Sequence, residues 1–167
     1  AGTTGIPSRD TVKRQLRDKL KQMQANGDSL DVITFSGNGE PTLHPSFKDI
    51  VHDVTVLRDR YYPQAKVSVL SNATMAANPR VKQALLAVDN NILKLDSAVA
   101  RTMRLINRPA SANVLPAGII EDLAEYGGKC IVQTMILRGE HNGERIDNTT
   151  TAEIDALIDA YKRIRPQ

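Results

Sequence analysis

Apolar and polar positions along this chain alternate between the period of a helix and the continuous runs of a buried strand. Near the amino end, the apolar residues at steps of three or four share one face of a helix from Ser8 to about Gln24. These residues are Val12, Leu16, Leu20 and Met23. Gly27 then favours a helix end. The run from Asp31 to Phe35 is β-branched and aromatic, so it predicts a buried strand.

The same alternation continues to the carboxyl end. Further helical stripes are expected at 47–61, 81–88, 114–126 and 154–164, and further strands at 66–70, 92–95 and 130–137. Asn78 before Pro79 has the form of a helix start, and Thr150 with Glu153 forms a capping box. The polar segment 138–148 is predicted to be a loop, of a length that often carries function.

A helix followed by four strand–helix units predicts an α/β fold in a single domain over 1–167. Because the strands are nearly continuous apolar runs, we expect them to be parallel and covered on both faces. In such folds ligands bind at the carboxyl ends of the strands. Polar segments follow each predicted strand there, at 37–40, at 71–72, at 96–97 and from Arg138.

Composition adds a few exclusions. The chain has 167 residues, a net charge of +3 and 41% hydrophobic residues, which is ordinary for a globular protein. Its apolar runs are far shorter than the ~20 residues of a membrane-spanning helix, so we expect no membrane partner and a cytoplasmic location. Cys130 is the single cysteine, which excludes an internal disulfide and a cysteine-cluster metal site built from this chain alone. We expect it to be an inert core thiol.

The most specific signal is the run from Thr34 to Pro45, between a predicted strand and a predicted helix. It contains Gly39-Glu40-Pro41 and ends in Thr42-Leu43-His44-Pro45. This run resembles the radical SAM superfamily, in the branch of wyosine-base synthases and pyruvate formate-lyase activating enzymes. There, a similar segment contacts the amino group of S-adenosylmethionine (SAM). A carboxylate and close backbone approach suit a cationic amine.

Three later segments extend the resemblance to most of the chain. Ser71-Asn72 resembles the family's polar pair near the ribose and carboxylate of SAM, Lys94-Leu95-Asp96 resembles the end of the next strand, and Gln133 lies where the family passes the adenine. The resemblance therefore implies these cofactor-binding residues: Gly37, Asn38, Gly39, Glu40, Pro41, Ser71, Asn72, Asp96 and Gln133. No catalytic residue and no metal ligand is expected within this chain.

The resemblance also implies a fold and a reaction. The fold is a partial, TIM-barrel-like (β/α) barrel without its first and last strands. The enzyme is an iron–sulfur oxidoreductase-like protein that cleaves SAM reductively to a 5′-deoxyadenosyl radical. It uses a 4Fe-4S cluster, a reductant protein, and a tRNA or a glycyl-radical protein as substrate. The family's three-cysteine motif has no match here, so the cluster ligands are expected upstream of Ala1 and the chain alone is expected to be inactive.

Other interpretations stay open for the same residues. Glu40 is also suited to a helix N-terminus, Asn72 and Asp96 to helix caps, and His44 to a structural turn. The basic helix 8–24 suits either a solvated face or RNA. For the whole chain, one alternative is a non-catalytic α/β module that binds a nucleotide or a protein. Another is an unrelated barrel enzyme that acts on a phosphorylated metabolite.

Overall fold

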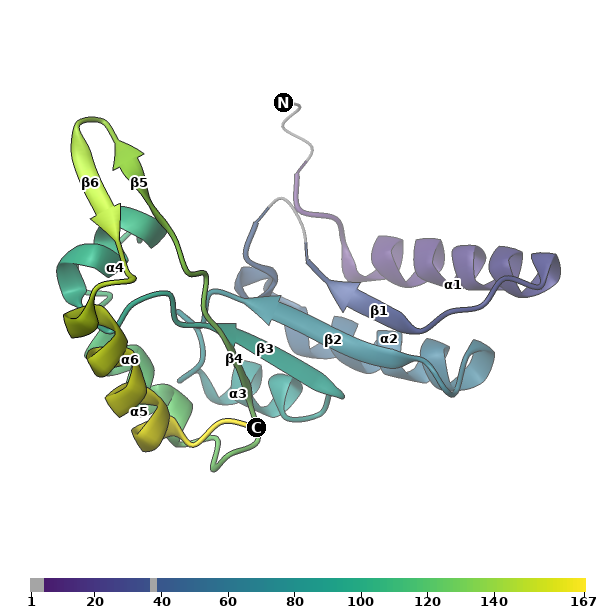
Figure 1. Ribbon diagram of the computed structural model, residues 1–167. Coiled ribbons are helices and arrows are strands. Elements are labelled where there is room, and N and C mark those ends of the chain that lie inside the picture. Colours follow the sequence, from purple (N-terminus) through teal and green to yellow (C-terminus); the bar gives the residue numbers. More distant parts are fainter. Residues whose placement is uncertain (1–4, 37–38) are drawn as a thin grey trace. The chain divides into compact units, whose positions relative to one another are not determined.

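The computed structural model describes residues 5–36 and 39–167 (Figure 1). The chain has an α/β fold with one four-stranded sheet in the order β1-β2-β3-β4 and a two-stranded sheet, β5-β6. In chain order the elements are α1 (Arg9–Asn26), β1 (Val32–Phe35), the 3-10 helix η1 (Pro41–Leu43), α2 (Phe47–Tyr61), β2 (Lys66–Ser71), α3 (Pro79–Leu85), β3 (Asn90–Lys94), α4 (Ala100–Asn107), α5 (Pro116–Ala124), β4 (Ile131–Gln133), β5 (Arg138–His141), β6 (Glu144–Asp147) and α6 (Thr151–Ile164). Within the described ranges, no helix has both the length and the apolar character that crossing a membrane requires.

The fold divides into two compact units. The first comprises 1–70 and 78–91, and the second comprises 71–77 and 92–167. In the first, β1 and β2 pair in parallel from Val32 opposite Lys66. In the second, β3 and β4 pair in parallel from Ile92 opposite Ile131. The predicted α/β class and parallel sheet are thus confirmed, whereas the single domain over 1–167 stays a prediction.

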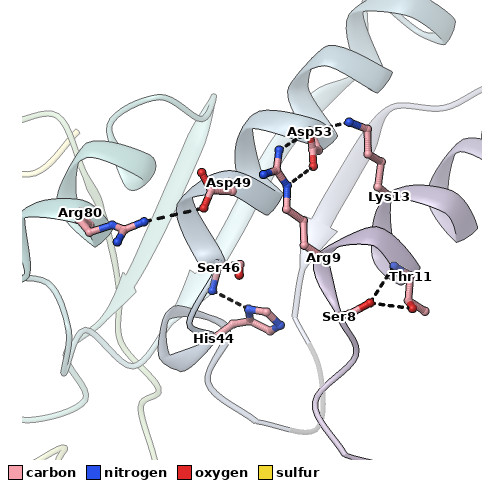
Figure 2. A network of polar contacts seen from close by, with 9 residues as sticks. All are labelled: Ser8, Arg9, Thr11, Lys13, His44, Ser46, Asp49, Asp53 and Arg80. Atoms are coloured by element: carbon pink, nitrogen blue, oxygen red, sulfur yellow. Dashed lines mark hydrogen bonds and ion pairs between the residues drawn. The ribbon is translucent and has the colours of Figure 1, made fainter.

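In the first unit, α1 lies against α2. Gly27 ends α1 at a φ of 76°, as the sequence predicts, and the Ser8 side chain caps its start by accepting from the Thr11 backbone N–H. The buried Asp53 of α2 accepts two hydrogen bonds from Arg9, at 2.6 and 3.0 Å, and one from Lys13 at 3.0 Å (Figure 2). Two of the basic residues of α1, Arg9 and Lys13, therefore bind α2 rather than a ligand.

The second unit is held by a core under α5 and α6. The largest fully buried side chains there include Leu93, Leu95, Leu123 and Ile164. On the surface, Arg163 of α6 binds the carboxylate of Glu121 on α5 at 2.7 Å. The buried side chains come from β3 and the segment after it, from α5 and from α6, and the exposed ion pair joins the two helices.

Four segments differ from the sequence prediction. The predicted loop 138–148 is the hairpin β5-β6, whose turn residues Asn142 and Gly143 have φ of 52° and 76°. This pair of positive φ values suits a two-residue hairpin turn. Helix α4 was not predicted, and the predicted helix 114–126 is the shorter α5, which begins at Pro116.

The fourth predicted strand, 130–137, was also too long, because β4 ends at Gln133. Beyond it, side chains replace strand partners: the Met135 N–H donates to Asp96 at 2.9 Å, and the Leu137 N–H donates to Asn148 at 2.8 Å. These bonds satisfy the backbone without continuing the parallel ladder.

Candidate functional site

The second unit contains a cavity of about 260 Å³ at the carboxyl ends of its strands. Its walls come from the segment after β2, the end of β3, α4, the connection to α5, α5 itself and the segment after β4. The lining residues are Asn72, Thr74, Lys94, Leu95, Asp96, Met103, Ile106, Asn107, Pro109, Val114, Ile119 and Met135. The cavity is therefore built where an α/β fold places a ligand.

Asp96 is the central polar group of this cavity. Its side chain is fully buried and accepts from Lys94 Nζ at 3.0 Å, from Asn107 Nδ2 at 2.7 Å and from the Met135 backbone N–H at 2.9 Å. The three donors come from β3, α4 and the segment after β4. A buried carboxylate needs such partners, and in return it fixes all three segments around the cavity.

Asn72 and Lys94 are two further polar residues in the wall of the cavity. The Asn72 carboxamide oxygen accepts from both the backbone N–H and the hydroxyl of Thr74, at 3.0 and 2.7 Å, which forms a local turn. The Lys94 side chain is 32% exposed. A hydrogen bond anchors the segment that carries Asn72: the buried Tyr126 hydroxyl donates to the Ala76 carbonyl at 3.1 Å.

Asn148 joins the cavity to the hairpin. Its side chain is fully buried, and its Nδ2 donates to the carbonyls of Asp96, at 2.8 Å, and Met135, at 2.7 Å. Its Oδ1 accepts from the Leu137 N–H at 2.8 Å. One side chain thus connects the ends of β3 and β4 to the base of β5-β6.

Of the predicted site residues, the structure brings Asn72 and Asp96 to this cavity, together with Lys94. Ser71 and Gln133 are not among its described lining residues. The buried Ser71 hydroxyl oxygen accepts from the Ala73 N–H at 3.1 Å, and the Gln133 carbonyl accepts from the Leu95 N–H at 3.0 Å. Asp96 is not the helix cap that one interpretation suggested, because Val99 is the N-cap of α4.

The glycine-rich segment belongs to the first unit. Gly37 and Asn38 lie outside the described residues. Gly39 precedes Glu40, whose Oε1 accepts from the Thr42 N–H at 3.1 Å and from the Thr42 hydroxyl at 2.5 Å. Glu40 therefore caps η1, which begins at Pro41. The SAM-binding role of Gly39, Glu40 and Pro41 stays a prediction.

His44 has the structural role that the sequence favoured. Its Nδ1 accepts from the Ser46 backbone N–H at 3.0 Å (Figure 2), so its Nε2 carries the proton and donates to the Pro7 carbonyl at 2.9 Å. Both ring nitrogens are used in this turn.

Sequence reasoning missed the part of the cavity wall that α4 supplies. Met103, Ile106 and Asn107 lie three and four residues apart, which places them on one helix face. This spacing was visible in the sequence, but the segment is short and has no capping side chain, so the signal for a helix was weak.

Across the described part of the chain, no group of three or more histidine, cysteine, aspartate or glutamate side chains could hold a metal ion. Cys130 is fully buried, and burial raises the pKa of its thiol. It has the surroundings of an inert core residue, as predicted.

Comparison with curated proteins finds partial similarity. No family model matches the chain. It is 34% identical over 112 residues to a UPF0026 protein of Synechocystis, covering 65% of this chain and 40% of that protein. It is 32% identical over 133 residues to a UPF0026 protein of Methanocaldococcus jannaschii, covering 78% of this chain and 39% of that protein. It is also 25% identical over 151 residues to a GTPase Obg of Brachyspira hyodysenteriae, covering 89% of this chain and 20% of that protein. The chain thus spans at most two fifths of the length of these three relatives.

Solved structures show the same fold. The crystal structure of Streptococcus suis SuiB bound to S-adenosylmethionine matches with a TM-score of 0.60 and 17% identity, over 93% of this chain and 32% of that chain. A second SuiB crystal structure matches with a TM-score of 0.60 and 14% identity. At this level of identity, the similarity shows a common fold.

Proposed function

We propose that this chain supplies SAM-binding segments of a radical SAM enzyme, and that the cavity of the second unit holds part of the SAM molecule. The observation that carries the proposal is that Asn72, Asp96 and Met135, from segments after three different strands, line one cavity. The resemblance of the sequence implies SAM contacts at Asn72 and Asp96. The fold shared with SAM-bound SuiB supports the same ligand.

The cavity suits a nucleoside. Most of its lining is apolar, with Leu95, Ile106, Ile119 and Met135 among the walls, and such walls suit an aromatic base. Its volume of about 260 Å³ is below the ~300–1,000 Å³ of typical ligand pockets, so it accommodates the adenosine end rather than the whole of SAM.

Lys94 is the group that we assign to an anionic or hydroxyl oxygen of the ligand. An ammonium group has three N–H donors, and the contact with Asp96 at 3.0 Å uses one of them. Asp96 then acts as a positioning residue, because its other bonds hold Asn107 and the Met135 backbone in place. For Gly39, Glu40 and Pro41 in the first unit, the proposed contact with the amino group of SAM rests on the resemblance of the sequence alone.

The described residues do not fit a 4Fe-4S cluster, because ligation needs several thiolates and Cys130 is fully buried. We therefore propose that the cluster ligands lie in another part of a longer protein, and we assign no step of radical chemistry to this chain. The partial barrel, the reductant protein, the tRNA or glycyl-radical substrate and the cytoplasmic location belong to the same proposal.

Titration calorimetry of the chain with SAM tests the binding site. We expect saturable binding, weakened about tenfold or more by Lys94→Met, since a hydrogen bond from a charged group contributes about 1.5–3 kcal/mol. Lys19→Met, on the exposed surface of α1, is the matched control and should bind as the unchanged chain does. No saturation, or equal affinity in the Lys94 and Lys19 variants, would refute the assignment.

Anaerobic reconstitution with iron and sulfide tests the cluster assignment. The chain should retain no stoichiometric iron, and a stable cluster on it would contradict our account. In a longer protein that contains the upstream cysteines, SAM and dithionite should yield 5′-deoxyadenosine. Absence of that product, from protein shown to hold a cluster, would favour the non-catalytic binding module.

A further inference from the structure

Two arginines at the carboxyl end of α4 have no acidic partner. Arg104 and Arg108 are exposed and lie four residues apart, and across the described ranges neither side chain has an ion pair or a hydrogen bond. Arg104 lies in the last turn of α4 and Arg108 is its C-cap, where the helix dipole favours positive charge. The nearby Arg101, in contrast, pairs with Glu144 at 3.6 Å. The uncompensated charge at Arg104 and Arg108 is therefore a local feature that a bound anion would neutralise.

The same two arginines line two adjoining clefts of the second unit. One, of about 280 Å³, is bounded by Arg104, Arg108 and the hairpin residues His141, Asn142 and Glu144. The other, of about 400 Å³, is bounded by the same arginines with Pro109 and Ala112. Both guanidinium groups thus border hollows rather than a flat surface.

The register of the hairpin explains which of its side chains face the arginines. His141 lies opposite Glu144 and Gly139 lies opposite Ile146, so these residues share one face of the ribbon. Ile146 is buried, and it lines the first cleft together with His141 and Glu144. Since successive residues point to opposite faces, the other face carries a separate set of charges. There, Arg138 and Arg145 both bind Asp147, each at 3.0 Å.

The groove also has a fixed geometry. The Asn148 side chain ties the base of the hairpin to the carbonyls of Asp96 and Met135. At the other wall, Arg108 ends α4 with a φ of 45°, and its backbone N–H donates to the Arg104 carbonyl at 3.1 Å. These bonds fix the backbone that carries Arg104 and Arg108 on one wall and His141 on the other.

We propose that the groove between α4 and the β5-β6 hairpin binds a phosphate group, held by Arg104 and Arg108 with His141 as a further donor. Guanidinium groups match the geometry of phosphate oxygens and bind them in pairs. Glu144 also lines this groove, so its carboxylate weakens anion binding, and the exposed ion pair with Arg101 offsets part of that effect. The phosphate is either one of a polynucleotide backbone or a single group on a small molecule.

Titration with two probes tests this site in the full chain. The first probe is inorganic phosphate, followed by the backbone amide resonances of residues 139–146. The second is fluorescein-labelled decauridylate, followed by anisotropy at several salt concentrations. Both experiments omit SAM, so failure here is distinguishable from failure of the proposed function.

The test variant is Arg104→Gln with Arg108→Gln. Its control is Arg14→Gln with Arg165→Gln, which removes the same amount of charge. Arg14 is exposed within α1, like Arg104 within α4, and Arg165 is the left-handed C-cap of α6, like Arg108 after α4. We expect the test variant to bind both probes about tenfold more weakly or worse, since each charged hydrogen bond contributes more than ~1 kcal/mol. The control should bind as the unchanged chain does.

The salt dependence identifies the source of the phosphate. If decauridylate contacts both arginines through its backbone, the test variant should lower the slope of log affinity against log salt by about 1.4, or ~0.7 per lost contact. If a single phosphate is the ligand, inorganic phosphate should displace decauridylate and the slope should change by less. Equal losses in test and control variants, or no binding of either probe, would overturn the proposal.

Discussion

Replacement of Asp96 by asparagine tests the organisation of the cavity most directly. The Asp96 carboxylate accepts from Lys94, Asn107 and the Met135 N–H, and its side chain is fully buried. Asparagine has nearly the same shape, so Asp96→Asn changes the polar groups without opening a void. It offers one acceptor oxygen and an N–H₂ group that only donates.

Neither orientation of the asparagine satisfies all three donors. If its oxygen faces Met135, its N–H₂ group meets the donors of Lys94 and Asn107. If it is flipped, the N–H₂ group meets the buried Met135 N–H. The flipped orientation keeps the bonds from Lys94 and Asn107 and loses only the bond from the Met135 N–H, which is worth about 1.5–3 kcal/mol when its acceptor is charged. The two remaining bonds also become weaker, because their acceptor loses its charge, so we expect a loss of about 2 kcal/mol in the free energy of unfolding.

Urea denaturation followed by far-UV circular dichroism at neutral pH measures this loss. Asp155→Asn, an exposed change on α6, is the matched control and should stay within about 0.5 kcal/mol of the unchanged chain. The slope of free energy against urea should be equal in both variants, which shows that the unfolded states are comparable. A loss below about 1 kcal/mol for Asp96→Asn would refute the view that this carboxylate organises the cavity.

Two further predictions concern groups outside the cavity. The hydrogen bonds from Arg9 and Lys13 lower the pKa of the buried Asp53 from 3.8 to about 2, so this carboxylate stabilises the fold above about pH 4, and that stability is lost as the pH falls toward 2. The shift corresponds to about 2 kcal/mol, reduced somewhat because both partners are partly exposed. Asp53→Asn should remove this part of the pH dependence of the free energy of unfolding. The control Asp59→Asn, at an exposed position of α2, should not. Parallel pH profiles for the unchanged chain and both variants would contradict the prediction. Burial raises the pKa of the Cys130 thiol, so a thiol-specific reagent should label it only after unfolding, and rapid labelling of the native chain would show that the thiol is accessible.

The sequence predicted helix ends well where a residue type strongly prefers one structural position, such as asparagine at an N-cap or glycine after the last helical residue. Asn78 caps α3 through bonds to the N–H groups of Arg80 and Val81, and Gly27 ends α1 in the left-handed region. The strands at 66–70 and 92–95 lie close to β2 and β3 because their apolar runs fit a buried parallel sheet.

The hairpin was missed for a different reason. Asn142-Gly143 is a strong signal for a two-residue turn, yet the flanking residues are polar and lack the alternation of a half-buried strand. All four residues of β5 are exposed, so hydrophobic periodicity had nothing to detect. A prediction that started from the turn residues Asn142-Gly143 would have found the hairpin within 138–148.

The hydrogen-bond partners within the cavity could not be predicted from the sequence. The resemblance named Asn72 and Asp96, but the three donors to Asp96 come from positions that are brought together only by the fold. Glu153 shows the same effect: Thr150 caps α6 by accepting from the Glu153 N–H, as predicted, but the buried Glu153 carboxylate accepts from the distant Ser97 hydroxyl at 2.7 Å. Long-range partners of a buried carboxylate depend on tertiary packing rather than on local spacing.

The pairing register has a consequence for the order in which the chain folds. Strands β3 and β4 are separated by two helices, so their pairing requires closure of a long loop, whereas the two strands of β5-β6 are joined by Asn142 and Gly143 alone. Local hairpins form within microseconds, and parallel pairs form more slowly. The Asn148 side chain, however, finds its acceptors only when the ends of β3 and β4 are in place. The hairpin can therefore form early, but it becomes anchored only in the last stages of folding.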